Sequence, residues 1–160
     1  MGIEIERRFL VQGSAWRKGN GVRITQGYLC WEEGRIVRVR LAAGRAFLTI
    51  KGPSHQGAKP EFEYEIPAPD GEQMLLLCQG ALIEKIRRQA LYRGFPWEVD
   101  EFLGENSGLV VAEIELNDVT QGFERPAWLG EEITGDPRYT NARLSITPYH
   151  RWRDRVSPSG

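Results

Sequence analysis

The chain has 160 residues, of which 41% are apolar and 27% are charged, a composition typical of one folded domain and unlike that of a disordered chain. Its net charge of −1 argues against a general nucleic-acid binder or a membrane-surface protein. That sum conceals 17 arginines against 4 lysines. The bias fits either genomic base composition or a site that binds phosphate or carboxylate through the planar guanidinium group.

Cysteine and histidine give no sign of a metal centre. Cys30 and Cys78 are far apart in the sequence, so we expect reduced packing residues of a cytoplasmic protein. His55 and His150 stand in polar, loop-like surroundings, and neither a zinc site nor a Ser-His pair is expected from them. We expect no signal peptide or transmembrane run.

Alternation with a period of two is the dominant pattern of the chain. Residues 4–11 show it first: Glu4, Glu6 and Arg8 point one way, and Ile5 and Phe9 point the other. The same alternation predicts seven more strands, separated largely by turns that contain glycine. These strands are expected at residues 22–31, 35–41, 46–51, 61–66, 81–93, 97–102 and 109–116. Residues 81–93 also fit a helix, but the tight turn that follows favours a strand.

Short helices are expected between and after these strands. Asp70 is a predicted N-cap in a capping box with Gln73, for a helix that runs to about Gln79 and ends at Gly80.

Less order is expected in the last third of the chain. A helix is predicted to follow Asn117 and to break at residues 126–130, and a short helix is predicted from about Asn141. Residues 150–160 are polar and rich in arginine, which predicts a loosely ordered tail.

One face of the predicted strands collects charge. It holds nine acids and six bases, namely Glu4, Glu6, Arg8, Arg38, Arg40, Lys51, Glu61, Glu63, Glu65, Lys85, Arg87, Glu98, Asp100, Glu113 and Glu115. An open sheet with this face in water explains each strand separately, but not the shortage of helices for a two-layer fold. A closed, eight-stranded antiparallel barrel with a charged lumen and flanking helices, a mainly-β α+β fold, explains the whole set.

A charged lumen predicts a charged ligand, because buried charge is costly unless it is paired or coordinating. Clustered carboxylates favour a hard cation such as Mg²⁺ or Mn²⁺. Clustered arginine and lysine favour a polyanion. Together they indicate a metal-bound polyphosphate.

The ordered set of motifs resembles the CYTH superfamily, or triphosphate tunnel metalloenzymes. The signature of that family is E-x-E-x-K near the start of an eight-stranded tunnel, and residues 4–8 match it with Arg8 in place of the lysine. The resemblance covers roughly residues 1–146 and leaves residues 147–160 as a polar tail. It continues through residues 26–29, 37–40, 48–51, 61–65, 84–87, 97–100, 113–115 and 138–141.

The resemblance implies metal-dependent phosphoanhydride chemistry on a small-molecule triphosphate, with no specific nucleic acid and no membrane as partner. The implied metal ligands are Glu4, Glu6 and Glu115 with Glu113, while Glu61, Glu63 and Asp100 hold a second metal or orient the attacking water. The implied phosphate contacts are Arg8, Arg38, Arg40, Lys51, Lys85, Arg87 and Arg138. The catalytic residues that the resemblance implies are two of these cations, Arg8 and Lys85, together with the acids Glu4, Glu6, Glu61, Glu63 and Asp100.

The arginine at position 8 bears on rate. Lysine can shift its pKa and move a proton, whereas arginine stays charged in proteins. Arg8 substitutes well if the family's lysine only contacts phosphate, and it predicts a slower enzyme or another proton donor if that lysine shuttles a proton.

Among the activities that the resemblance implies, we expect hydrolysis of inorganic tripolyphosphate to pyrophosphate and phosphate. Selecting a base requires stacking aromatics, and Phe9, Phe62, Tyr64, Trp97 and Phe102 are all predicted on the outward face. The inward face then offers charges with Thr25 and Thr49. Thiamine triphosphatase and class IV-like adenylate cyclase are the alternative enzymes, and a module that binds polyphosphate or a nucleotide without turnover is the non-enzymatic one.

Overall fold

A computed structural model describes residues 2–32 and 34–155 of the chain, and those residues form one antiparallel sheet with short helical elements at its margins. The strands are β1 (Gly2–Glu4), β2 (Glu6–Val11), β3 (Val22–Glu32), β4 (Arg35–Ala42), β5 (Arg45–Lys51), β6 (Lys59–Ile66), β7 (Gln79–Tyr92), β8 (Phe95–Phe102), β9 (Val110–Glu115) and β10 (Leu129–Glu132). The α-helices are α1 (Ala68–Leu75) and α2 (Asn141–Leu144). Single 3-10 turns occupy η1 (Gly104–Asn106), η2 (Pro137–Tyr139), η3 (Tyr149–Arg151) and η4 (Arg153–Arg155).

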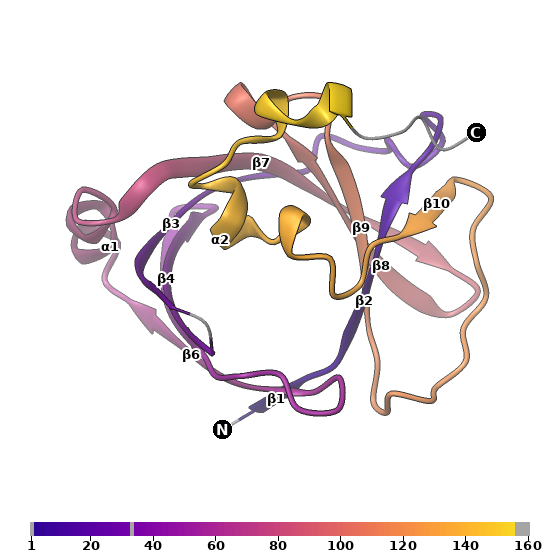
Figure 1. The fold of residues 1–160 in the computed structure, drawn as a ribbon, viewed down its shortest axis with the longest axis horizontal. Coiled ribbons are helices and arrows are strands. Elements are labelled where there is room, and N and C mark those ends of the chain that lie inside the picture. Colours follow the sequence, from indigo (N-terminus) through magenta and orange to yellow (C-terminus); the bar gives the residue numbers. More distant parts are fainter. Residues whose placement is uncertain (1, 33, 156–160) are drawn as a thin grey trace.

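The strand order is β1-β6-β5-β4-β3-β7-β8-β9-β2-β10, and every neighbouring pair is antiparallel. The expected eight strands are therefore ten within the described residues, and β1 and β10 are the ends of the ladder rather than partners in a closed ring. The expected first strand is interrupted at Ile5, so that β1 pairs with β6 while β2 pairs with β9. Figure 1 shows the strands curving around a central space.

Tight hairpins keep successive strands in register. Ala43 and Gly44 join β4 to β5 with positive φ values of 51° and 76°, and Arg93 and Gly94 join β7 to β8 with φ values of 51° and 82°. Two left-handed residues in a row are the geometry of a type I′ turn, which matches the right-handed twist of its strands. Glycine at the second position removes the steric cost there.

Two apolar clusters support the sheet. The first contains Phe9, Trp97 and Ile114 and is covered by Phe123 and Trp128 from the segment that precedes β10. Phe9 and Trp97 contact each other edge to face, with ring centroids 5.8 Å apart. The second, which we call the end cluster, comprises Ile83, Phe102, Leu109, Val111, Ile133, Tyr139 and Leu144.

Phe102 corrects the predicted faces. It lies two residues from Asp100 and therefore shares its side of β8, and the Lys85 ammonium stands 5.4 Å from the centroid of its ring. Thr25 is also misplaced, because its register partners Leu41 and Glu84 alternate with inward-facing Arg40 and Lys85. Thr25 therefore faces outward.

The first helix begins earlier than predicted. Pro67 is the N-cap of α1, the Asp70 side chain makes no capping bond, and Leu76 is the C-cap. Proline fits the first turn because the backbone N–H groups there need no helical partner. Asp70 instead lies in the first turn, where its charge complements the helix dipole. Gln79 and Gly80 already belong to β7.

The end of the chain also differs from expectation. No helix follows Asn117 among the described residues, where the Asp118 carboxylate instead accepts hydrogen bonds from the backbone and hydroxyl of Thr120. The short strand β10 forms instead, and the helix from Asn141 is confirmed as α2. Residues 150–155 are ordered rather than loose, because Trp152 packs edge to face on Tyr139 and Tyr149. Residues 156–160 of the expected tail lie outside the described range.

No helix among the described residues is both long and apolar enough to span a bilayer.

Candidate functional site

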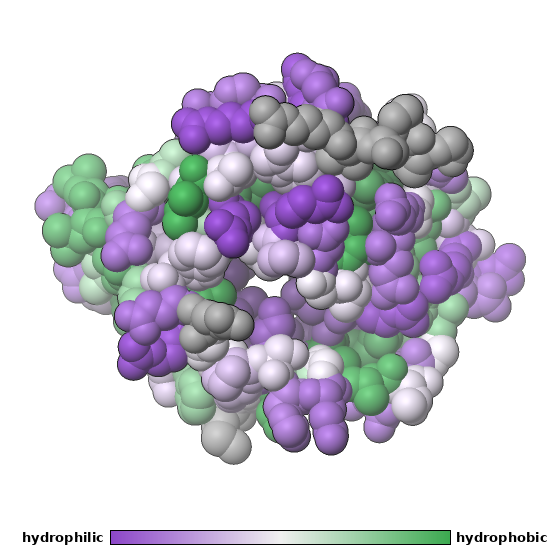
Figure 2. Space-filling view, in the orientation of Figure 1, coloured by the Kyte–Doolittle hydropathy of each residue, from purple (hydrophilic) through white to green (hydrophobic). Residues whose placement is uncertain are grey.

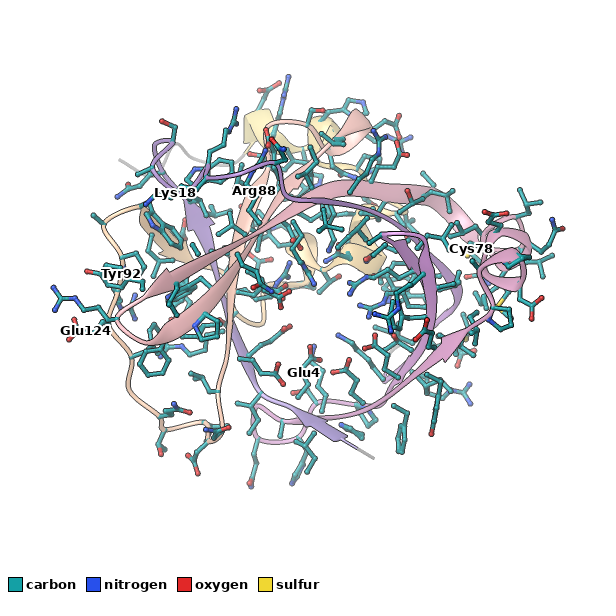
Figure 3. All side chains as sticks on the ribbon, turned by 180° about the vertical axis from the view of Figure 1, so that it is seen from behind. Glu4, Lys18, Cys78, Arg88, Tyr92 and Glu124 are labelled. Carbon is teal, nitrogen blue, oxygen red and sulfur yellow. The ribbon has the colours of Figure 1, made fainter. Side chains whose placement is uncertain are left out.

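The charged faces of the strands meet in the central space. Figure 3 shows Glu4 directed into that space, whereas Cys78, Tyr92 and Glu124 lie around the outside of the sheet. The opening at the centre of Figure 2 is bordered mainly by hydrophilic residues. The predicted inward orientation of the alternating charges is therefore correct for most of the set. Glu65 forms an exposed pair with Arg45 at the rim, and Glu63 and Glu115 are exposed as well.

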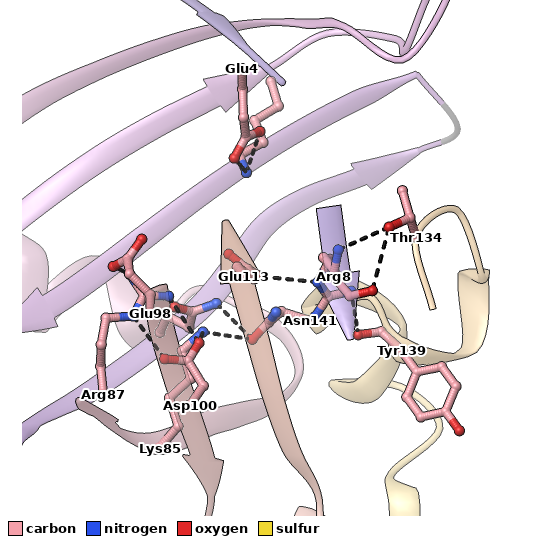
Figure 4. Close-up of polar contacts among 12 residues, drawn as sticks. Glu4, Arg8, Lys85, Arg87, Glu98, Asp100, Glu113, Thr134, Tyr139 and Asn141 are labelled. Carbon is pink, nitrogen blue, oxygen red and sulfur yellow. Dashed lines mark hydrogen bonds and ion pairs between the residues drawn. The ribbon is translucent and has the colours of Figure 1, made fainter. Parts of the chain in front are cut away.

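The most buried charges form one cluster on β7 and β8. Asp100 is 2% exposed, and its two oxygens are contacted by Lys85 Nζ at 2.8 Å and by Arg87 Nε and Nη2 at 2.7 and 2.9 Å (Figure 4). Arg87 also contacts Glu98 at 2.8 Å. Burial alone would raise the pKa of Asp100, but Lys85 and Arg87 hold that pKa well below its ordinary value.

Lys85 differs from the other cations in its acidity. It is 1% exposed, and burial lowers the pKa of its ammonium to about 7, although Asp100 opposes the shift. Lys85 can therefore gain or lose a proton near neutral pH, which Arg87 beside it cannot.

Arg8 connects the sheet to the segment that precedes α2. Its Nε donates to Glu113 Oε1 at 2.9 Å and its Nη1 donates to the Tyr139 carbonyl at 2.9 Å, while its Nη2 is buried and has no hydrogen-bond partner among the described residues. Burial raises the pKa of Glu113, but Arg8 together with Arg87 and Lys85 outweighs it and the pKa falls to about 2. The arginine that replaces the family's lysine is thus held by two fixed acceptors and retains one free donor.

Arg38 is held in a similar way across β4, β5 and β6. Its Nη2 lies 3.1 Å from Thr49 Oγ1 and 3.4 Å from Glu63 Oε1, and the Thr49 hydroxyl donates to the same carboxylate oxygen at 2.8 Å. The Arg38 Nε is buried and has no hydrogen-bond partner within residues 2–32 and 34–155. An unpaired buried donor on a charged group is costly, so this one favours an anion in front of it.

Arg40 is oriented by a neutral residue. Its Nε donates to Gln26 Oε1 at 2.9 Å, and within the described residues no carboxylate lies at ion-pair distance from it. Burial, together with Arg38 and Arg87, lowers the pKa of Arg40 to about 10.

A second group of acids lies on β1, β2, β6 and β9. Lys51 Nζ contacts the two oxygens of Glu4 at 3.0 and 3.1 Å, and Glu6 is the register partner of Glu115. Burial raises the pKa of Glu6 well above its ordinary value, and the nearby carboxylates of Glu113 and Glu4 raise it further. Burial and Glu4 also raise the pKa of Glu61 and Glu115.

This second group has the carboxylate ligands of a divalent-cation site, but the carboxylates are not yet close enough together to bind a cation. Its members raise one another's pKa, which marks negative charge that a cation would neutralise. Their oxygens are the donors that Mg²⁺ and Mn²⁺ prefer. Within residues 2–32 and 34–155, however, no three acids stand close enough together to hold a metal ion as they are.

One predicted site residue lies away from the rest. Arg138 on η2 pairs with Asp136 at 2.6 Å, stacks near Tyr139 and Trp152, and has a side chain that is 53% exposed. Conversely, Gln26, Tyr28 and Asn141 belong to the site but were not among the predicted site residues. All three lie in segments that resemble the family, residues 26–29 and 138–141, and Gln26 and Tyr28 also share the inward side of the alternation.

The antiparallel sheet around a charged centre defines this as a protein of the tunnel-fold class, and the chain belongs to the CYTH domain family, whose match covers residues 2–142. It is similar to an inorganic triphosphatase of Acetivibrio thermocellus, with 46% identity over 156 residues, 96% of this chain and 100% of that protein. It is also similar to an inorganic triphosphatase of Nitrosomonas europaea, with 34% identity over 148 residues, 90% of this chain and 97% of the relative. The crystal structure of the inorganic triphosphatase NE1496 aligns with a TM-score of 0.64 at 33% identity, over 89% of this chain and 97% of that one.

Proposed function

We propose that this protein is a metal-dependent triphosphatase that hydrolyses inorganic tripolyphosphate to pyrophosphate and phosphate at its charged inner face. The observation that carries the proposal is the set of unsatisfied guanidinium donors there. Arg8 Nη2 and Arg38 Nε are buried without partners, and Arg40 has a neutral partner in Gln26. A polyanion would satisfy these donors, and the likeness to two inorganic triphosphatases supports the same activity.

We further propose that the sheet works as a closed tunnel. One residue, Ile5, separates β1, which pairs with β6, from β2, which pairs with β9. The N-terminal segment therefore joins the two sides of the sheet through its covalent backbone. Glu4 and Glu6, on either side of this junction, would then face the same enclosed space as Glu115.

The cations divide the work of binding the phosphates. Arg8, Arg38 and Arg40 present free or weakly compensated donors, and we assign them the direct contacts to phosphate oxygens. We assign Lys51, Lys85 and Arg87 to the same clamp. Arg138 receives no contact in this proposal because it faces away and is paired with Asp136.

A divalent cation fits the acids on the N-terminal side. Glu4, Glu6, Glu61 and Glu115 would hold it. The pKa of Glu6, Glu61 and Glu115 is raised, whereas at Glu4 burial is outweighed by Lys51 and the pKa is lowered, so the group as a whole lacks positive charge. When bound, Mg²⁺ or Mn²⁺ supplies neutralisation of charge on the phosphate oxygens. Asp100 is occupied on both oxygens by Arg87 and Lys85, so we assign it to fixing these two cations rather than to a metal.

The reaction is an in-line displacement. The oxygen of a water molecule bonds to a terminal phosphorus as the bridging P–O bond breaks, pyrophosphate leaves, and a carboxylate such as Glu63 or Glu61 takes the proton of the water. Lys85, with its pKa near 7, is the cation able to give a proton to the leaving oxygen. Arg8 stabilises charge without moving a proton.

The preference for an inorganic substrate rests on what the inner face offers. Tyr28 and Phe102 do face inward, contrary to the expectation of a face without aromatics, but both are almost fully buried and leave no ring surface for stacking. Phe47, beside Arg40 in the sheet register, is half-buried and lies against Arg45 at the rim. It is the group through which a nucleotide or thiamine triphosphate would gain affinity.

The test is a phosphate-release assay of tripolyphosphate, ATP and thiamine triphosphate, each with Mg²⁺ and with Mn²⁺. We expect the highest kcat/KM for tripolyphosphate and no release in excess EDTA. Cyclic AMP as the main product from ATP, or a preference for either organic triphosphate, would overturn the substrate assignment. Binding of tripolyphosphate without any turnover would instead support a binding module.

A further inference from the structure

Two buried amides link the two groups of cations. Arg40 Nε donates to Gln26 Oε1 at 2.9 Å, and Gln26 Nε2 donates to Asn141 Oδ1 at 3.3 Å. Lys85 Nζ donates to the same Asn141 oxygen at 3.0 Å (Figure 4). Gln26 is fully buried and also donates to the Tyr28 hydroxyl at 3.1 Å. We call Gln26 and Asn141 the amide bridge.

The chemistry of the ends fixes the orientation of both amides. Guanidinium and ammonium groups only donate hydrogen bonds. Gln26 must therefore turn its oxygen to Arg40, and Asn141 must turn its oxygen to Lys85. The Gln26 NH₂ is then the only group that can complete the link between the amides, which is the arrangement observed.

Amides orient these cations without neutralising them. Arg40 has Gln26 as its hydrogen-bond partner, and Lys85 shares the single charge of Asp100 with Arg87. Aspartate at position 141 would keep the oxygen that accepts from Gln26 and Lys85 but would cancel positive charge that a triphosphate requires, whereas glutamate at position 26 would also lose the NH₂ that donates to Asn141. A neutral bridge inside a cluster of charged residues therefore suits a site that must remain attractive to an anion.

Asn141 reaches this position from outside the sheet. It is the first residue of α2, whose N-cap Thr140 accepts a hydrogen bond from the Arg143 backbone at 3.2 Å. Leu144 of the same helix and Tyr139 before it are buried in the end cluster. The apolar contacts of the end cluster thus fix the segment that supplies the amide to Lys85.

We propose that Gln26 and Asn141 are positioning residues of the triphosphate site, a neutral bridge that fixes Arg40 and Lys85 relative to each other while leaving their charge available to phosphate. The inference rests on the proposed triphosphatase function. It predicts that the two amides act as one unit, because either loss breaks the same link.

The experiment compares Gln26→Leu, Asn141→Leu and their double variant with Gln26→Glu and Asn141→Asp, by phosphate release from tripolyphosphate and by thermal unfolding. Each leucine variant is expected to lower kcat/KM about tenfold or more, and the double variant no further than the worse single variant, because coupled residues are not additive. Asn141→Asp keeps the accepting oxygen and is expected to raise KM about tenfold with little change in kcat, whereas Gln26→Glu also loses the donor to Asn141 and is expected to lower kcat as well. Asn106→Asp is the matched control, because Asn106 is also buried but holds the Tyr149 backbone at 2.8 Å.

The outcomes separate the two claims. Wild-type kinetics in both leucine variants, or losses that multiply in the double variant, would overturn the bridge while leaving the triphosphatase intact. An equal rise in KM for Asn106→Asp would show that any added buried charge suffices, which also overturns it. Should the leucine variants fail to fold, the KM of Asn141→Asp decides the question alone: a raised KM supports the bridge and an unchanged KM overturns it. A wild type that neither binds nor hydrolyses tripolyphosphate would overturn the proposed function and the bridge together.

Discussion

Replacing Asp100 by asparagine tests whether the inner cluster is held by charge. The side chain keeps its shape, but Lys85 and Arg87 lose the anion that contacts both of them within 2.9 Å. Removing one partner of a buried ion pair costs about 3–5 kcal/mol, since it leaves uncompensated buried charge. In a domain of this size that corresponds to a fall in Tm of roughly 6–20 °C.

The measurement is urea unfolding of wild type and Asp100→Asn, with Glu65→Gln at the exposed Arg45 pair as control. The folded pKa of Asp100 lies below its unfolded value, so its stabilisation is present above the unfolded pKa and is lost as the pH falls through the folded pKa. The difference in unfolding free energy should therefore be present at neutral pH and should shrink as the pH falls below the ordinary Asp pKa. A variant as stable as wild type, or no less stable than the Glu65→Gln control, would refute the reasoning.

Three further predictions concern activity. The double variant Glu4→Gln/Glu6→Gln should be folded and lack metal-stimulated phosphate release, and full activity in that variant would remove these acids from the metal site. Arg38→Ala and Arg40→Ala should each lose about 2–5 kcal/mol of transition-state stabilisation if the phosphate contact is desolvated, and wild-type kcat/KM in both would place the clamp elsewhere. Arg8→Lys should stay active but lower the Tm, because lysine cannot bond Glu113 and the Tyr139 carbonyl through separate nitrogens; an unchanged Tm would argue against this anchoring role.

Most of the sheet could be predicted because alternating charge is a strong signal when it recurs on strand after strand. Glu61 and Glu63 illustrate it, since each acid sits two residues from the next and the observed register places them opposite Lys51 and Thr49. The same signal fails at strand ends. The strand break at Ile5 and the added strand β10 depend on pairing partners that lie more than 50 residues away, at Pro60 and Val11.

The candidate site was predictable only as far as its charges. Asn141 and Gln26 carry no charge, and Asn141 reaches Lys85 from a helix whose position is decided by Leu144 in the end cluster. Local sequence cannot encode that meeting, because it arises from packing between distant segments. The helix expected after Asn117 does not form, for a related reason: the segment packs Phe123 against Trp97 and Phe9 instead of making helical backbone hydrogen bonds.

The break at Ile5 has a consequence for how the molecule is assembled. Glu4 belongs to a strand whose partner is β6, and Glu6 to a strand whose partner is β9, so residues 4–6 must wait for residues beyond 110 before both pairings can form. Contacts of such long sequence separation form late and slowly. The acids near the N-terminus therefore join the cations only in the last folding steps, and partly folded or truncated chains would lack the metal-binding half of the site.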